Sequence, residues 1–83
     1  MANLTLYSKP DCPLCDEARA ALGRVGSRVH FDLDEVDITT QPELDARYRE
    51  RIPVVAVDGE EVFDFHVDEP ALEQRLSEGA LAR

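Results

Sequence analysis

Apolar and polar positions recur with different periods along the 83-residue chain, and each change of period marks a predicted element. A short strand is predicted over residues 4–8, where apolar and β-favouring residues follow one another. After Cys12 the apolar side chains recur at helical spacing, and Gly26 and Ser27 end the predicted helix. The apolar residues that share this helical face are Leu14, Ala18, Ala21, Leu22 and Val25.

The pattern of the next segment is less regular. Phe31 and Leu33 alternate in one phase, whereas Val36 and Ile38 alternate in the other. Successive side chains of a regular strand point to opposite faces, so a single face cannot hold all four. We expect an irregular lead-in and then a strand that ends near Ile38.

A second helix is predicted from a capping motif and a proline. Thr40 and Glu43 have the spacing of a capping box, in which Thr40 caps the helix and Glu43 reaches back. This helix carries Tyr48 on its apolar side and ends before Ile52, because residue 53 is a proline.

The last third of the chain predicts a hairpin and a helix. Residues 54–57 form an apolar run suited to a buried strand, and Asp58 and Gly59 are a strong two-residue turn signal. Residues 60–65 supply the returning strand, and Asp68 can cap a final helix.

The predicted order is strand, helix, strand, helix, strand, strand, helix, within a single domain of residues 1–83. The first strand-helix-strand unit makes two parallel strands through a right-handed crossover, and the hairpin adds two antiparallel strands. The expected fold is therefore α/β, with a four-stranded mixed sheet and helices on both faces.

Charge narrows the range of partners. Nine Lys and Arg stand against 18 Asp and Glu, a formal net charge of −9 that repels nucleic acids and anionic membrane surfaces. The excess has two interpretations, a solubilising surface or a preference for basic protein partners. No apolar run approaches the roughly 20 residues of a membrane span, and the first residues lack a signal-peptide pattern. We therefore expect a monomeric, cytoplasmic protein.

The two cysteines of the chain, Cys12 and Cys15, are the strongest chemical signal. They lie where a predicted strand turns into a helix, and the unpaired N–H groups and dipole of a helix start favour a thiolate at Cys12. Pro13 suits the first helical turn, where an N–H has no helical partner. Cys15 follows one turn later, close enough to form a disulfide. Lys9 and Asp11 flank the pair with opposite charges.

Three interpretations of the cysteine pair stay open. The first is redox catalysis, in which Cys12 attacks a disulfide and Cys15 resolves the product. The second is binding or delivery of a soft metal, for which two thiolates supply half of a tetrahedral shell. His30 and His66 can complete such a shell only if they reach the loop, and His30 is expected far from it. The third is a buried structural pair. For the chain as a whole, a catalytically silent module that binds a protein partner is a further alternative.

A proline opens the buried third strand. Proline is excluded from strand interiors but tolerated at the first residue, and a bond such as that between Ile52 and Pro53 can be cis at modest cost. We expect this bond to be cis, which turns the Ile52 backbone toward the cysteine loop. Its N–H and C=O are then predicted to pair with an extended substrate.

Two segments, together with the element order, resemble the glutaredoxin family of the thioredoxin-fold superfamily. They are YSKPDCPLC at residues 7–15 and RIPVV at residues 51–55. The first is similar to the family's strand-Lys-x-x-Cys-Pro-x-Cys signature, and the second to its Thr-Val-Pro strand opening. The likeness covers nearly the whole chain and is closest to small bacterial glutaredoxin-like proteins. It implies a thioredoxin-like fold and a thiol–disulfide oxidoreductase activity.

The resemblance also implies residue roles. Cys12 corresponds to the nucleophile, Cys15 to the resolving thiol, Lys9 to the contact for the glutathione carboxylate and Pro53 to the cis-proline. The substrate-binding residues expected on this basis are Lys9, Pro13, Ile52 and Pro53. The implied partner is a disulfide-bearing protein or glutathione, with no tightly bound cofactor and no metal.

The chain departs from the family at residues 63–68, where glutaredoxins have a Gly-Gly and an acidic pair that bind the γ-glutamyl end of glutathione. Here Phe65 and His66 fill space that glycines leave open, which argues against glutathione as co-substrate. Asp68 remains available for such a contact. Phe63 and Phe65 share one strand face, and we expect both to pack in the core. His66 is either a surface histidine or a group that assists proton transfer near the cysteines.

Overall fold

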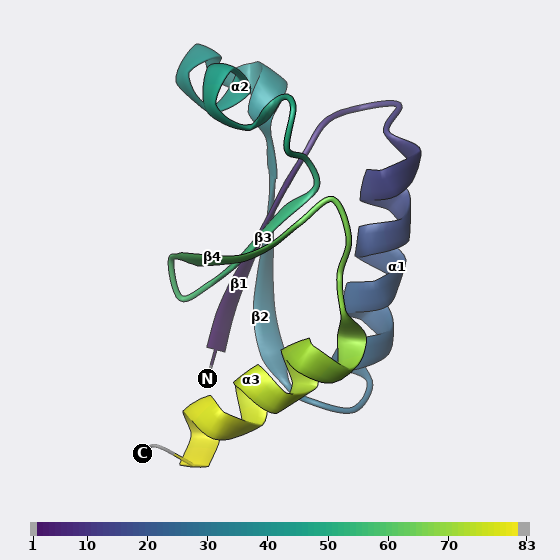
Figure 1. The fold of residues 1–83 in the computed structure, drawn as a ribbon, viewed down its shortest axis with the longest axis vertical. Coiled ribbons are helices and arrows are strands. Elements are labelled where there is room, and N and C mark those ends of the chain that lie inside the picture. Colours follow the sequence, from purple (N-terminus) through teal and green to yellow (C-terminus); the bar gives the residue numbers. More distant parts are fainter. Residues whose placement is uncertain (1, 82–83) are drawn as a thin grey trace.

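The computed structural model describes residues 2–81, and their elements follow the predicted order (Figure 1). The elements are β1 (Ala2–Ser8), α1 (Pro13–Gly26), β2 (Phe31–Asp37), a 3-10 helix η1 (Ile38–Thr40), α2 (Pro42–Tyr48), β3 (Val54–Val57), β4 (Glu60–Asp64) and α3 (Glu69–Leu81). The four strands form one mixed sheet in the order β2-β1-β3-β4, which confirms the predicted fold class. No helix in this part of the chain is long and apolar enough to cross a membrane.

The register of the sheet brings the end of β1 beside the start of β3. β1 runs parallel to β2 and antiparallel to β3, with Tyr7 opposite Val54. β4 returns antiparallel to β3 after the turn at Asp58 and Gly59, whose φ angles are 50° and 87°. Positive φ at both central residues is the geometry of the favoured two-residue hairpin turn, so this prediction is confirmed.

β2 is a regular strand, and the expected irregular lead-in is wrong. It pairs with β1 residue by residue from Phe31 to Asp37. The two apolar phases fit one strand because both faces of the sheet are covered. Phe31 packs against one core and Ile38, just past the strand, against the other. Leu33 stays 40% exposed on this edge strand.

Helices cover the two faces of the sheet unequally, with α1 and α3 on one side and α2 on the other (Figure 1). We call the apolar clusters beneath them the α1/α3 core and the α2 core. The buried residues of the α1/α3 core are Leu4, Leu6, Ala18, Ala21, Leu22, Val25, Val55, Val57, Val67, Leu72 and Leu76. The α2 core consists of Cys15, Ile38, Tyr48, Ile52 and Val54, with Tyr7, Cys12 and Leu44 packed against it.

The predicted cap is confirmed at α3 and is wrong at α2. Asp68 accepts a hydrogen bond from the Ala71 N–H at 3.2 Å and caps α3 as predicted. The capping box at Thr40 is wrong, because Thr40 belongs to η1 and its hydroxyl donates to the Asp37 carbonyl at 2.7 Å. Gln41 is the N-cap residue of α2 and makes no side-chain capping bond.

Candidate active site

The cysteine motif begins directly after the tight turn that leaves β1. Asp11 in this turn has a φ of 58°, a left-handed conformation that Asp tolerates better than most residues. Cys12 follows in extended conformation as the N-cap of α1, with Pro13 in the first helical turn. Its Sγ accepts the Cys15 N–H at 3.3 Å, and the Asp16 N–H donates to its carbonyl at 3.1 Å. The start of α1 thus directs an N–H group at the Cys12 sulfur.

The two thiols have contrasting surroundings. Both cysteines are free, but Cys12 is partly exposed whereas Cys15 is fully buried in the α2 core. Burial raises the pKa of the Cys15 thiol from its ordinary 9.0 to about 11, and a hydrogen bond with Cys12 acts in the same direction. A backbone hydrogen bond from Lys9 opposes these effects. Cys15 is therefore held as a thiol at neutral pH, behind the more accessible Cys12.

The proline opposite the motif lies where the sequence predicts it. The Ile52-Pro53 bond is cis, as expected, and both residues are buried. Ile52 belongs to the α2 core together with Cys15. The expectation that the Ile52 N–H pairs with a substrate is wrong, because that N–H donates to the Tyr48 carbonyl at 3.0 Å. It completes the last turn after α2 instead.

The Lys9 side chain is exposed in the turn after β1, on the same loop as Cys12. Its predicted contact with a substrate carboxylate stays a prediction. The two histidines are separated in the fold. His30 precedes Phe31, which pairs with Ala2 at the opposite end of β1 from the cysteine loop. Among the residues that the structure describes, no group of three or more His, Cys, Asp or Glu is placed to hold a metal ion.

A polar network that the sequence does not suggest ties the motif helix to the sheet. Arg19 on α1 donates to both carboxylate oxygens of Glu35 on β2, at 2.8 and 2.5 Å. The hydroxyl of buried Ser8, the last residue of β1, donates to Glu35 at 3.0 Å. The hydrogen bonds from Arg19, and after them the one from Ser8, lower the pKa of the Glu35 carboxyl. Arg19 also lies near enough to lower the pKa of Cys15 through its charge.

A second network of aromatic and polar contacts borders the α2 core at Tyr48. Tyr7 and Tyr48 stack with ring centroids 4.4 Å apart. The Tyr48 hydroxyl donates to Glu61 at 2.8 Å, and Arg51 donates to the same carboxylate at 2.6 Å. Burial, followed by the bond to Glu61, raises the pKa of Tyr48 to about 12. The bonds from Arg51 and Tyr48 lower the pKa of Glu61.

The comparisons with known proteins agree with this geometry. The family model described as Glutaredoxin-like domain (DUF836) matches residues 3–77. The chain belongs to this glutaredoxin-like family.

Relatives of this glutaredoxin-like protein include one of known structure in X. campestris, a structural-genomics target with 36% identity and a TM-score of 0.73. That match covers 90% of this chain and 96% of the other. An uncharacterized protein of Mycobacterium tuberculosis is 32% identical over 72 residues, 81% of this chain and 74% of its own length. A thioredoxin from Halobacterium salinarum, at 20% identity, shares the fold with a TM-score of 0.67, over 93% of this chain and 73% of its own.

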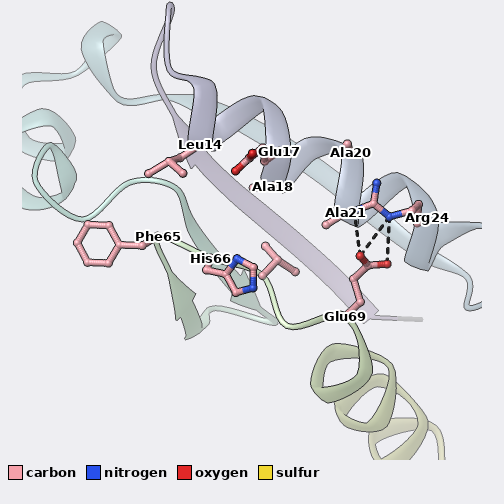
Figure 2. A pocket seen from close by; sticks show the side chains of 10 residues that line it. Leu14, Glu17, Ala18, Ala20, Ala21, Arg24, Phe65, His66 and Glu69 are labelled. Atoms are coloured by element: carbon pink, nitrogen blue, oxygen red, sulfur yellow. Dashed lines mark hydrogen bonds and ion pairs between the residues drawn. The ribbon is translucent and has the colours of Figure 1, made fainter.

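One feature of this glutaredoxin-like protein lies outside the predicted site residues. A pocket of about 410 Å³ separates the first turns of α1 from the segment between β4 and α3 (Figure 2). Its lining includes Leu14, which stands between the two cysteines, together with Phe65 and His66. The expectation that Phe65 packs in the core is wrong. It lies past the end of β4 with a φ of 66° and is 48% exposed, whereas Phe63 packs on the α1/α3 core.

The sequence carries only weak signals of the network formed by Arg19, Glu35 and Ser8. Arg19 lies one turn beyond Cys15, and Glu35 falls in an acidic strand that the crossover brings beside β1. The parallel register places Glu35 opposite Leu6, within reach of both Ser8 and Arg19. That register depends on tertiary packing, so spacing alone did not reveal the network.

Proposed function

We propose that this protein is a thiol–disulfide oxidoreductase in which Cys12 is the nucleophile and Cys15 the resolving thiol. The observation that carries the proposal is the position of the Cys12 sulfur. It caps α1 and accepts the Cys15 N–H at 3.3 Å, while Cys15 itself is completely buried behind it. A thiolate is the reactive form of cysteine, and a helix N-terminus stabilises that anion.

The proposed reaction has two exchange steps. The Cys12 thiolate attacks one sulfur of a substrate disulfide, forms a mixed disulfide and releases the other sulfur as a thiolate that takes up a proton. The Cys15 thiol then loses its proton and attacks the Cys12 sulfur, which releases the second substrate sulfur. The dithiol has supplied two electrons and two protons, and the protein ends as the Cys12–Cys15 disulfide. A thiol reductant must restore the dithiol before another turnover.

The different surroundings of the two thiols support these roles. Because burial raises the pKa of Cys15 to about 11, its thiolate is scarce at neutral pH and it attacks only after Cys12 has reacted. Mixed-disulfide formation removes the hydrogen bond between the two sulfurs and places an electrophilic sulfur beside Cys15. Lys9 precedes the motif, Pro13 lies within it, and Ile52 packs in the same core as Cys15. We assign Lys9, Pro13, Pro53 and the Ile52 backbone carbonyl to substrate contact.

A single-turnover experiment tests the proposal without an added reductant. Fully reduced protein is mixed with a chromogenic mixed disulfide, and the released thiol and the mass of the protein are followed. The wild-type protein is expected to consume one equivalent and to end as an intramolecular disulfide. Cys12→Ser should slow the reaction at least about a thousandfold, since no accessible thiolate remains. Cys15→Ser should stop at the mixed disulfide on Cys12.

The same data separate the alternatives. A protein whose Cys12→Ser variant reacts as fast as wild type does not work as proposed. A silent binding module would show a Cys12 that alkylates no faster than a free cysteine. A soft-metal carrier would bind Cu(I) or Zn²⁺ through both thiolates, so stoichiometric, tight metal binding by the reduced protein would favour that class instead.

The partner we propose is a disulfide-bearing protein in a reducing, cytoplasmic setting, with the enzyme acting as a monomer. Glutathione is the second candidate. The side chains of Phe65 and His66, both exposed beside the motif, occupy the segment that the γ-glutamyl end would need. Trapping with Cys15→Ser distinguishes the two, because the mixed disulfide carries either a protein or only glutathione.

A further inference from the structure

The pocket along the first turns of α1 combines exposed apolar side chains from two separate segments. Leu14 is 46% exposed on α1, and Phe65 is 48% exposed on the segment between β4 and α3. Three large apolar side chains are exposed among the residues that the structure describes, and two of them line this pocket. Figure 2 shows both at the same end of the pocket, with Glu17 and His66 next along it. Exposed apolar side chains that gather around a hollow commonly mark an interaction site.

Phe65 is held in this position by its backbone. Its φ of 66° turns the side chain away from the face that β4 packs, and its N–H donates to the Pro53 carbonyl at 2.8 Å. The exposed ring is therefore tied to the strand that opens beside the cysteine motif. Leu14 is fixed by the motif itself, two residues after Cys12. A polypeptide bonded to Cys12 is therefore held two residues from Leu14, at the end of the pocket that Leu14 shares with Phe65.

The charges in the pocket favour a cationic occupant. Arg24, at the far end, is already paired with Glu69 at 2.9 Å (Figure 2). Glu17 lines the pocket between the two ends, and its carboxylate has no ion-pair partner among the described side chains. The chain as a whole carries a formal charge of −9. An unpaired carboxylate beside an apolar surface suits a basic side chain and repels an acidic ligand.

We propose that this pocket selects disulfide-bearing polypeptides with an apolar residue and a basic residue next to the disulfide. The apolar side chain lies between Leu14 and Phe65, and the basic side chain reaches Glu17. The inference rests on the proposed function, since the reacting disulfide is brought to Cys12. A pocket of about 410 Å³ is within the size range of small-ligand sites and holds a few side chains. Glutathione has no apolar side chain, and its two carboxylates outweigh its one ammonium, so it suits this pocket less well.

Two synthetic peptides test this specificity. Each carries one cysteine joined to 2-nitro-5-thiobenzoate as a mixed disulfide, and the two differ only in the flanking residues, Leu and Lys against Ser and Glu. Reduced protein converts peptide mixed disulfide into free peptide thiol and the coloured thiolate, and becomes oxidised itself. The readout is the ratio of second-order rate constants for the two peptides, which cancels changes in dithiol reactivity. Wild-type protein should favour the Leu-Lys peptide about tenfold or more.

Variants of the pocket should lower this ratio. Phe65→Asn introduces a residue that tolerates the positive φ at this position, and it is expected to remove most of the preference for Leu. Glu17→Gln should lower the preference for Lys about threefold, as for a partly exposed ion pair. Matched controls lie elsewhere: Leu33→Gln makes another exposed leucine polar, and Glu43→Gln removes the same charge from α2. Both controls should keep the wild-type ratio.

Each outcome bears on one proposal or the other. Equal rates for the two peptides, with rapid turnover of both, would overturn the specificity inference and leave the oxidoreductase intact. An equal drop in the ratio for Glu17→Gln and Glu43→Gln would show that overall charge, and not the pocket, selects the peptide. If neither peptide reacts, the proposed function fails. The specificity of the pocket is then tested by the binding of a fluorescent Leu-Lys peptide that has Ser in place of Cys. Binding that Phe65→Asn weakens supports the pocket, and absence of binding overturns it.

Discussion

The two faces of the sheet are packed by different kinds of side chain. The α1/α3 core has only aliphatic side chains among its buried residues. The α2 core contains or contacts both cysteines and both tyrosines of the chain. It is also bordered by charged groups, since Tyr48 bonds to Glu61 and Glu61 to Arg51. The first core stabilises the fold by burial alone, whereas the second carries thiols and phenols that can titrate.

This division has a physical reason. A buried thiol or phenol needs a hydrogen-bond partner, and each partner restricts the geometry of its neighbours. The α2 core meets this need for the Cys15 thiol with hydrogen bonds to the Cys12 side chain and the Lys9 backbone, and for the Tyr48 hydroxyl with the bond to Glu61. Substitutions on the two faces should therefore differ in kind: aliphatic truncation changes stability only, whereas changes around Tyr48 and Cys15 alter pH dependence and reactivity as well.

The largest effect is expected from truncation in the α1/α3 core. Leu72 of α3 is fully buried, so Leu72→Ala should lower the free energy of unfolding by about 2–5 kcal/mol, from lost burial and the cavity left behind. Urea unfolding measures the loss. Alkylation of Cys12 in the folded variant should keep the wild-type rate. Leu33→Ala, at a 40% exposed leucine, is the control and should change stability by less than about 0.5 kcal/mol.

Elements that depend on local spacing could be predicted from the sequence. The helical period of the apolar residues after Cys12 gives the buried face of α1 except at Leu14, which is 46% exposed. The apolar run before Asp58 gives β3 with its observed bounds. The cysteine pair at a helix start is likewise a local pattern, and so is the proline at a strand opening. These features involve residues only a few positions apart, so no knowledge of packing was needed.

What could not be predicted depends on long-range pairing or on competing local hydrogen bonds. Phe65 alternates correctly for a core position, but β4 ends one residue earlier and a bond to the Pro53 carbonyl turns the chain outward. Thr40 has the spacing of a cap, but its hydroxyl is taken by Asp37. Glu35 looks like a solvated strand residue until the crossover brings Arg19 beside it. In each case a partner distant in sequence, or a competing local bond, decides the outcome.

Alkaline pH should weaken the α2 core selectively. Raising the pKa of Cys15 from 9.0 to about 11 means that the folded protein holds this proton more tightly than the unfolded chain. The corresponding stability, roughly 2–3 kcal/mol, is present below pH 9 and is lost as the pH rises toward 11. Tyr48, with a pKa raised to about 12, extends the loss to higher pH. Unfolding free energies measured from pH 7 to 11 should therefore fall with increasing slope.

The variant Cys15→Ala tests whether ionisation of Cys15 causes this loss of stability. Cys15→Ala removes the titrating group, so its stability curve between pH 9 and 11 should be flatter than that of wild type. The slope is the readout, because the substitution also changes packing by a constant amount. Identical slopes for the two proteins in that range would contradict the role given to burial of Cys15.

A smaller effect is expected at the hydroxyl of Tyr48. Tyr48→Phe keeps the ring stacked on Tyr7 and removes only the 2.8 Å bond to Glu61, so stability should fall by about 1–2 kcal/mol at neutral pH. Glu61→Gln leaves an amide in place of the carboxylate, and the double variant completes a mutant cycle. The coupling energy from urea unfolding should be clearly non-zero. Additive effects of the two substitutions would show that the bond contributes nothing.

The smallest effect is expected at the helix caps, which differ between α3 and α2. α3 is capped by the Asp68 carboxylate, so Asp68→Ala should cost about 1 kcal/mol. α2 has no side-chain cap, and Glu43→Ala should change stability by less than about 0.5 kcal/mol because Glu43 takes no part in a capping box. Both substitutions remove one exposed carboxylate from the first turns of a helix, which makes them matched for charge. A loss near 1 kcal/mol for Glu43→Ala would support a capping box at α2. If stability does not change, α2 is held on the sheet by Tyr48 and the apolar residues of its core.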